Sequence, residues 1–225
     1  RQRRSEITRF NHSSRVLKRG LALTPVKFGI SFTAKHLNQA GALVHIYTDG
    51  SIHVNHGGTE MGQGLYIKVA QVVASAFQVD LERVKVSATR TDKVPNTSPT
   101  AASSGSDLNG MAALDACEKI LAGLTEFAAQ NWSVSPETIR FSDNQVQIGE
   151  LEMPWETFVQ TAYMNRVPLS SSGFYATPKI HYDPKSGTGR PFLYYSNCAA
   201  CAEVVVDTLT GEYRVLRTDI LFDAG

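Results

Sequence analysis

The chain has 225 residues, of which 42% are hydrophobic and 19% charged, and its formal net charge is +1. This composition is typical of a globular protein and not of a disordered one. The near-neutral charge gives no sign of a nucleic-acid surface, and no run reaches the roughly 18 apolar residues of a membrane span. We therefore expect neither nucleic acid nor a membrane among the partners.

The first third of the chain predicts a linker, an extended run and a hairpin. Residues 1–18 are polar and begin with the basic cluster "RQRR", so we expect a linker or a cut end there. The stretch "LALTPVKFGISFT" then looks extended. The runs 42–48 and 51–55 alternate in polarity around Asp49-Gly50, which is a favoured two-residue turn, and they predict a β-hairpin.

The stretch "HGGTEMGQG", residues 56–64, predicts a binding loop. Glycine is favoured where a backbone turns sharply or approaches a ligand, and a loop that leads into a helix can hold an anion. The glycine spacing matches neither the dinucleotide fingerprint nor the phosphate loop. Gln63 lies between two glycines, and its amide can donate and accept at once, which suits an oxo group or the edge of a heterocycle.

The remaining segments predict helices that alternate with short strands. Apolar residues recur at helical spacing from Leu65 to Ala76, and 84–91 alternates like a strand. A long helix with Asp107 as its cap, a short hairpin at 138–148 and a helix that starts near Pro154 follow. The last 35 residues predict two strands. Because the units are short and lack regular βαβ spacing, we expect an α+β fold with mixed sheets and packed helices.

Two loop-to-helix junctions are candidate ligand sites. Residues 57–64 and 96–106 each precede a helix, so each offers unpaired backbone N–H groups at the positive end of a helix dipole. The second adds the hydroxyls of Thr97, Ser98, Thr100, Ser103, Ser104 and Ser106. Such a loop can close around a phosphate. Together the junctions predict a ligand with a polar heterocyclic end and an anionic end.

Other reactive residues leave alternatives open. His56 either lines a site or has a structural role, and Glu60 is either a base or a carboxylate that stabilises a helix start. Cys198 and Cys201 form one CxxC inside an apolar run, which favours packing in a strand over a redox or metal pair. The odd number of cysteines, three, without a secretory signal indicates a reducing compartment, and we expect the cytoplasm.

Several stretches resemble the molybdenum-cofactor domain or subunit of the xanthine dehydrogenase and aldehyde oxidase family. They include "KFGISFT", "HGGTEMGQGLYIKVAQV", "VPNTSPTAASSGSDLNG", "GFYATP" and "LRTDILFDAG". The resemblance runs from about residue 19 to 225, so we expect a molybdopterin-binding domain there, with a variable insertion at about 128–153. The forms "GISFT" and "NTSPTAAS" favour the xanthine branch.

The resemblance also implies roles for particular residues. Met61, Gly62 and Gln63 would lie against the molybdenum centre and the pterin, without direct ligation of the metal by a side chain. The phosphate end of the cofactor would be surrounded by Thr100, Ala102, Ser103 and Ser106. Phe32 and Thr33 would contact the purine. Since neighbours in a regular strand point to opposite faces, we expect irregular backbone at 31–34.

The implied reaction converts hypoxanthine and xanthine to urate with oxygen from water. Electrons would pass through iron–sulfur clusters and FAD elsewhere in a dimeric complex to NAD. The family's "GEPP" glutamate, its general base, and its "GGGFGGK" segment do not occur here. We therefore expect an inactive fragment without a catalytic residue of its own. Two alternatives remain: a related molybdenum hydroxylase acting on aldehydes or another N-heterocycle, and a non-catalytic fragment that binds no cofactor.

Overall fold

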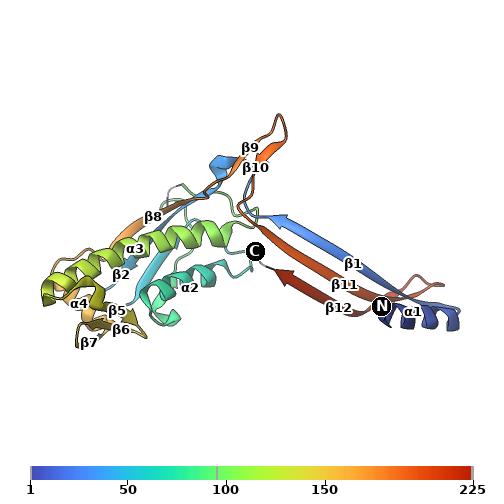
Figure 1. Ribbon diagram of the computed structural model, residues 1–225, viewed down its shortest axis with the longest axis horizontal. Helices are drawn as coiled ribbons and strands as arrows, with labels where there is room; N and C mark the ends of the chain where they lie inside the picture. The colour runs from blue at the N-terminus through green and yellow to red at the C-terminus, as the bar shows by residue number, and fades with distance from the viewer. Residues whose placement is uncertain (1, 95, 224–225) are drawn as a thin grey trace. The chain divides into compact units, whose positions relative to one another are not determined.

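The structure, a computed structural model, describes residues 2–94 and 96–223. The chain divides into two compact units (Figure 1). Unit 1 comprises Arg1–Ile30 and Phe192–Gly225, and unit 2 comprises Ser31–Pro191. Both contain helices and sheets, and the main sheet of unit 2 has parallel and antiparallel pairs, so the predicted α+β fold is confirmed. None of the described helices is long and apolar enough to cross a membrane.

Unit 1 is a three-stranded antiparallel sheet with one helix. The strand order is β1 (Leu17–Gly29), β11 (Tyr195–Asp207) and β12 (Tyr213–Asp223). Helix α1 (Gln2–Ser13) packs against β1, and Arg3 donates two hydrogen bonds to the buried carboxylate of Glu203, at 2.6 and 2.8 Å. A buried carboxylate needs such partners. The strands confirm the extended run as far as Gly29 and the two C-terminal strands. The boundary at residue 18/19 stays a prediction.

The two cysteines of the CxxC lie in β11, as predicted, but on opposite faces of the sheet. Cys198 pairs with Val26 and Phe222, whereas Cys201 pairs with Leu23 and Asp219. An odd separation along a strand reverses the side-chain direction. Both cysteines are free. The two thiols therefore cannot form a disulfide with each other or bind one metal together.

Unit 2 is built on a four-stranded sheet with the order β4-β3-β2-β8. Its strands are β2 (Gln39–Ile46), β3 (Ile52–His56), β4 (Val84–Val86) and β8 (Ser170–Ala176). The predicted hairpin is confirmed by the antiparallel pairing of β2 and β3. Helices α2 (Leu65–Phe77) and α3 (Gly105–Trp132) pack on each other, and α3 packs on β2 and β8 (Figure 1). One face of the sheet is therefore buried, through Ala40, Ala42, Val44, Ile46, Ile52 and Val54.

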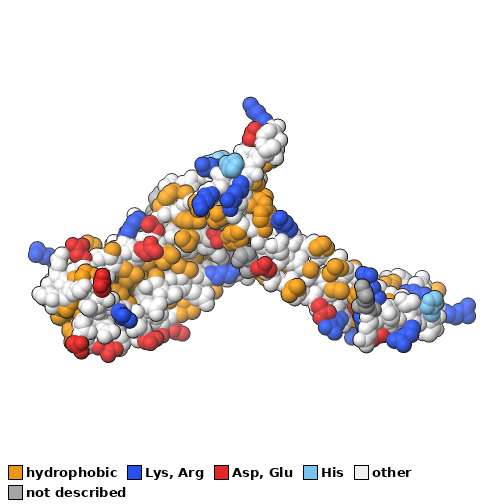
Figure 2. Space-filling model, in the orientation of Figure 1, with side chains coloured by type: hydrophobic (Ala, Val, Ile, Leu, Met, Phe, Trp, Pro, Cys, Tyr) orange, Lys and Arg blue, Asp and Glu red, His pale blue; other side chains and the backbone are white. Residues whose placement is uncertain are grey.

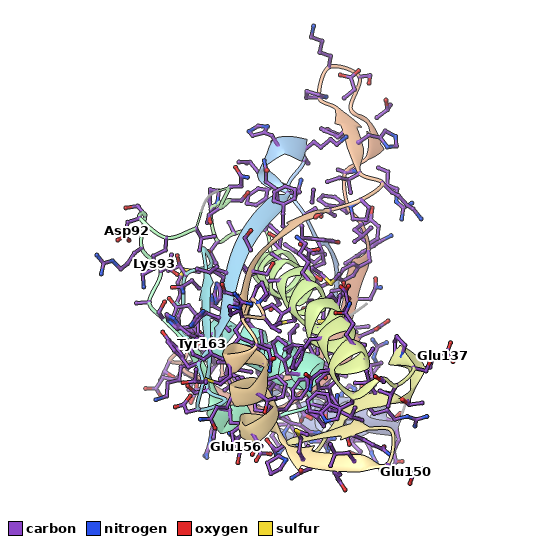
Figure 3. The ribbon with its side chains drawn as sticks, turned by 90° about the vertical axis from the view of Figure 1, so that its left-hand side faces the viewer. Asp92, Lys93, Glu137, Glu150, Glu156 and Tyr163 are labelled. Atoms are coloured by element: carbon purple, nitrogen blue, oxygen red, sulfur yellow. The ribbon has the colours of Figure 1, made fainter. Side chains whose placement is uncertain are left out.

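The segment 128–153 forms the end of α3 and a small antiparallel sheet. Its strands are β5 (Ile139–Ser142), β6 (Gln145–Ile148) and β7 (Leu151–Pro154). Apolar side chains of this sheet join the core beside helix α4 (Trp155–Met164), while Glu137, Glu150 and Glu156 point outward (Figure 3). Whether the segment is a variable insertion stays a prediction.

Several elements begin or end at other residues than the sequence predicts, and some were not predicted. Helix α3 starts at Gly105, so Asp107 lies in its first turn and not at its cap. Pro154 occupies the N-cap of α4 and does not enter its first turn. Strand β4 ends at Val86, before the end of the alternating run. The sequence did not predict β8, nor the hairpin of β9 (His181–Asp183) and β10 (Thr188–Arg190), whose strands pair with each other.

The contact between α3 and β8 has no room for a side chain at Gly173. A Cβ there would lie 2.0 Å from the Ala112 carbonyl oxygen and 2.6 Å from the Ala116 nitrogen. We predict that Gly173→Ala lowers the free energy of unfolding by about 1–3 kcal/mol, because backbone must shift to admit the methyl group. Denaturant unfolding of the purified chain measures this change.

The control variant is Gly123→Ala in helix α3, where an added Cβ meets nothing within 4 Å. It should raise the free energy of unfolding by roughly 0.5–1 kcal/mol, because alanine is the better helix former. A Gly173→Ala variant as stable as the wild type would show that α3 and β8 are not in this close contact.

Candidate functional site

The two predicted ligand loops meet at the start of α2 and α3. The Thr59 N–H donates to the Thr100 hydroxyl at 2.8 Å, which joins the loops directly. A Cβ at Gly57 would lie 1.7 Å from Thr97 Oγ1, and a Cβ at Gly58 would lie 2.5 Å from a Leu65 methyl carbon. Gly57 therefore allows the backbone of one loop to approach the other, and Gly58 allows the first loop to pack against the start of α2. Figure 3 shows Asp92 and Lys93 at the outer end of the loop that leads to α3.

A cavity of about 460 Å³ lies between the loops. It is lined by Met61, Gln63, Leu65, Lys68, Thr100, Ala101, Ala102, Ser103, Gly105 and Ser106. Six of the seven residues predicted to contact a cofactor are among these, and the seventh, Gly62, lies in the same loop with open space where a Cβ would be. Sequence reasoning missed Lys68, which lies one turn after Gly64 and so faces the loop.

The cavity wall suits a ligand that is partly anionic. Lys68 contributes a positive charge, Gln63 an amide and Thr100, Ser103 and Ser106 hydroxyls, and no carboxylate of the described residues belongs to the lining. Donors and a cation are what a phosphate requires. The described residues contain no group of three or more His, Cys, Asp or Glu side chains that could hold a metal ion.

The N-terminus of α3 faces this cavity. Ala102 and Ser103 adopt left-handed backbone, with φ of 56° and 53°, and turn the chain into the helix. The Ser104 hydroxyl donates to the Ala101 carbonyl and does not cap α3. The first N–H groups of a helix carry partial positive charge. Since Gly105 and Ser106 line the cavity, this charge lies at its wall.

The N-terminus of α2 is different, because Glu60 already occupies it. The Glu60 carboxylate accepts hydrogen bonds from the N–H groups of Gly62, Gly64 and Tyr66 at 2.9–3.1 Å. These bonds lower the pKa of Glu60. The expectation of unpaired N–H groups at this junction is therefore wrong. Of the two interpretations of Glu60, its contacts favour the stabilisation of a helix start.

The side chain of Gln63 folds back on its own loop. Its Oε1 accepts the Met61 N–H at 2.6 Å, and its Nε2 donates to the Thr59 carbonyl at 2.8 Å. An amide has two donors and two acceptor lone pairs, so each atom keeps one further hydrogen-bonding position. Gln63 can therefore hold the shape of the loop and contact a ligand at the same time.

Phe32 and Thr33 do not line this cavity. They lie between β1 and the short helix Lys35–Leu37, where Ser31 has a φ of 127°. The Asn38 side chain holds this segment, because its Oδ1 accepts the Phe32 N–H at 2.7 Å and its Nδ2 donates to the Phe32 carbonyl at 2.9 Å. The predicted irregular backbone at 31–34 is confirmed. Phe32 is half-buried and Thr33 is exposed, and their contact with a substrate stays a prediction.

Comparison with known proteins defines the class. The family model of the molybdopterin cofactor-binding domain matches residues 1–225, and the chain belongs to this family. The chain is similar to the xanthine dehydrogenase of Dictyostelium discoideum, with 48% identity over 227 residues that cover 100% of this chain and 15% of that protein. The resemblance to xanthine dehydrogenases is thereby confirmed, and the chain spans 15% of the length of the curated relatives it matches.

Two solved structures share the fold at low identity. The Cu,Mo-CO dehydrogenase aligns with a TM-score of 0.82 and 18% identity, over 100% of this chain and 29% of that one. The quinoline 2-oxidoreductase from Pseudomonas putida 86 aligns with a TM-score of 0.77 and 19% identity, over 98% of this chain and 28% of that one. These likenesses concern the fold alone.

The contacts of Glu60 predict a pH-dependent stability of the glycine loop. Its pKa in the folded chain lies below the ordinary value of 4.5. The stabilisation is therefore complete above the ordinary carboxyl range and is lost as the pH falls through the folded-state pKa. Glu60→Gln should lower Tm near neutral pH, and this difference from the wild type should shrink in acid.

Thermal unfolding of both proteins between pH 3 and pH 7 measures this prediction. Glu152→Gln, at an exposed position of β7, is the control and should change Tm little at any pH. A Tm difference for Glu60→Gln that is constant with pH would contradict the role of the carboxylate.

Proposed function

We propose that the chain is part of the molybdenum catalytic subunit of a xanthine dehydrogenase that converts hypoxanthine and xanthine to urate. One observation carries the proposal: Met61, Gln63, Thr100, Ala102, Ser103 and Ser106 come from two loops about 40 residues apart and line one cavity. Membership of the molybdopterin cofactor-binding family and the identity to xanthine dehydrogenases support it.

The residues of the cavity fit a molybdopterin. Met61 and Gln63 would hold its metal-bearing end, where the free positions of the Gln63 amide can donate and accept. Thr100, Ser103, Ser106 and Lys68 would hold its phosphate next to the start of α3. When bound, the cofactor supplies the redox chemistry by which a purine C–H is replaced by C–OH with oxygen from water, releasing two electrons and two protons.

A separate set of hydrogen bonds holds the segment of Phe32 and Thr33, which would contact the substrate. Phe32 would stack on the purine, and the exposed Thr33 would hydrogen-bond its edge. The two bonds from Asn38 fix the backbone of Phe32, so its ring is presented from a rigid segment. The Ser98 hydroxyl donates to the Gln39 carbonyl at 3.0 Å and ties this segment to the loop before α3. No residue of this chain is proposed as the general base.

Exposed apolar side chains of unit 1 support the partners proposed for the chain. Large apolar side chains of β12 are exposed, with Ile220 at 67%, Leu221 at 78% and Phe222 at 66%. Figure 2 shows hydrophobic side chains on the surface of this unit. Because successive strand residues point to opposite faces, both faces of β12 expose large apolar side chains, and exposed apolar surface of this kind marks an interaction site. We propose that the rest of the same subunit covers this apolar surface of β12. Iron–sulfur clusters and FAD in other parts of a dimeric, cytoplasmic complex would pass the two electrons to NAD.

The proposal is tested by Gln63→Ala in the full-length protein. The change removes both bonds that close the loop and the group proposed to meet the cofactor. We predict lower molybdenum content per polypeptide and lower turnover of xanthine, with the fold intact by circular dichroism. Gln147→Ala, at an exposed position of β6, is the matched control.

Two outcomes would count against the proposal. A wild-type protein without molybdenum would overturn the proposed function. A Gln63→Ala variant with full molybdenum content and full turnover would overturn the role of Gln63.

The substrate assignment predicts a ranking of two variants. Thr33→Val should cost about 0.5–1.5 kcal/mol of purine binding, because one neutral hydrogen bond is lost. Phe32→Ala should cost more, because stacking area and shape are lost together. Steady-state kinetics with xanthine on the full-length enzyme measures both. Wild-type kcat/KM in both variants would show that Phe32 and Thr33 do not contact the substrate.

A further inference from the structure

His56 is buried beneath the glycine loop. It is the last residue of β3, and its side chain is 2% exposed. Its Nδ1 accepts the N–H of Gly58 at 3.1 Å. A ring that accepts at Nδ1 carries its proton on Nε2, and Nε2 has no hydrogen-bond partner in the part of the chain that the structure describes. Burial lowers the pKa of His56 to about 4, so the ring is neutral at pH 7.

Gly58 is held on its carbonyl side as well. Thr89 Oγ1 donates to the Gly58 carbonyl at 2.5 Å, and the Thr89 N–H donates to the Tyr66 hydroxyl at 3.0 Å. The Tyr66 ring in turn packs edge-on against His56, with 5.2 Å between the ring centroids. Both polar groups of the Gly58 backbone are therefore fixed from below the loop.

Fixing Gly58 also fixes the cavity wall. The next residue, Thr59, donates its N–H to Thr100 and accepts the Gln63 amide at its carbonyl, both at 2.8 Å. A displacement of Gly58 would shift Thr59, and with it the bond between the loops and the orientation of Gln63. His56 does not line the cavity and acts on it only through these backbone bonds.

We propose that His56 is a positioning residue that sets the conformation of the glycine loop, and thereby cofactor retention, through the hydrogen bond from the Gly58 N–H to Nδ1. The acceptor and not the ring is the essential feature. The link to cofactor retention rests on the proposed function, whereas the effect on the loop can be measured without it.

Two variants distinguish the role of the hydrogen-bond acceptor of His56 from the role of its ring. His56→Asn places an amide oxygen where Nδ1 lies and so retains the acceptor, although it loses most of the ring. His56→Gln keeps more of the side-chain length but moves its polar atoms one bond farther out. His53→Gln, in the same strand but facing the other side of the sheet, is the control.

The full-length protein is examined by amide hydrogen exchange of residues 57–64 and by molybdenum per polypeptide after dialysis. We expect His56→Gln to speed exchange of the loop roughly tenfold and to lower cofactor affinity about tenfold, equivalent to 1.4 kcal/mol. Exchange in α4 should stay unchanged. His56→Asn and His53→Gln should stay within about twofold of the wild type on both measures, since each retains the Gly58 contact.

Unchanged exchange of 57–64 in His56→Gln would overturn the inference, and so would equal losses in His56→Asn and His56→Gln. Should His56→Gln fail to fold, His56→Leu replaces it, because it removes the Nδ1 acceptor and keeps an apolar side chain at this buried position. His56→Leu should also loosen the loop, and unchanged exchange of 57–64 in that variant would overturn the inference. A wild-type protein without molybdenum would refute the proposed function, while the exchange comparison would still decide the role of His56.

Discussion

The packing of α2 and α3 side by side on one face of the unit 2 sheet is the constraint on which the candidate site depends. The helices can lie this close to the sheet because residues at the contacts are small: Ala40 and Ala42 on β2, Ala112 and Ala116 on α3, and Gly173 on β8. Since both helices start at the same end of the unit, the loops that enter them must meet. The cavity is the space that their meeting leaves.

The two helix starts differ in how their N–H groups are used, so the two sides of the cavity differ. At α2 the carboxylate of Glu60 accepts the N-terminal N–H groups, whereas at α3 the Ser104 hydroxyl does not cap the helix and Asp107, in its first turn, is not part of the cavity lining. Lys68 adds its positive charge to the wall. An anionic group is therefore stabilised on the α3 side, while the amide of Gln63 and the thioether of Met61 suit an uncharged or metal-bearing group.

Local patterns explain which elements could be predicted. The hairpin around Asp49-Gly50 and the helix at 65–77 are encoded within short windows, by turn chemistry and by apolar periodicity. Strand β8 was missed because "SSSGFYA" has little apolar alternation, and its partner β2 lies about 130 residues earlier in the chain. Its conformation depends on that pairing and on the close approach of α3, which no local pattern reveals.

The sequence by itself determined the α+β class, the glycine-rich and hydroxyl-rich loops, the family resemblance and the irregular backbone beside Phe32. The fold class and the loops follow from residue types and short-range spacing, whereas the irregular backbone beside Phe32 was expected from the roles that the resemblance implies for Phe32 and Thr33. Only the tertiary structure decided that six loop residues share one cavity, that Lys68 joins them, and that Glu60 and His56 serve the backbone of the loop. The reason is physical: hydrogen-bond partners such as Thr59 and Thr100 are far apart in sequence, and only the packing of the two helices brings them into contact.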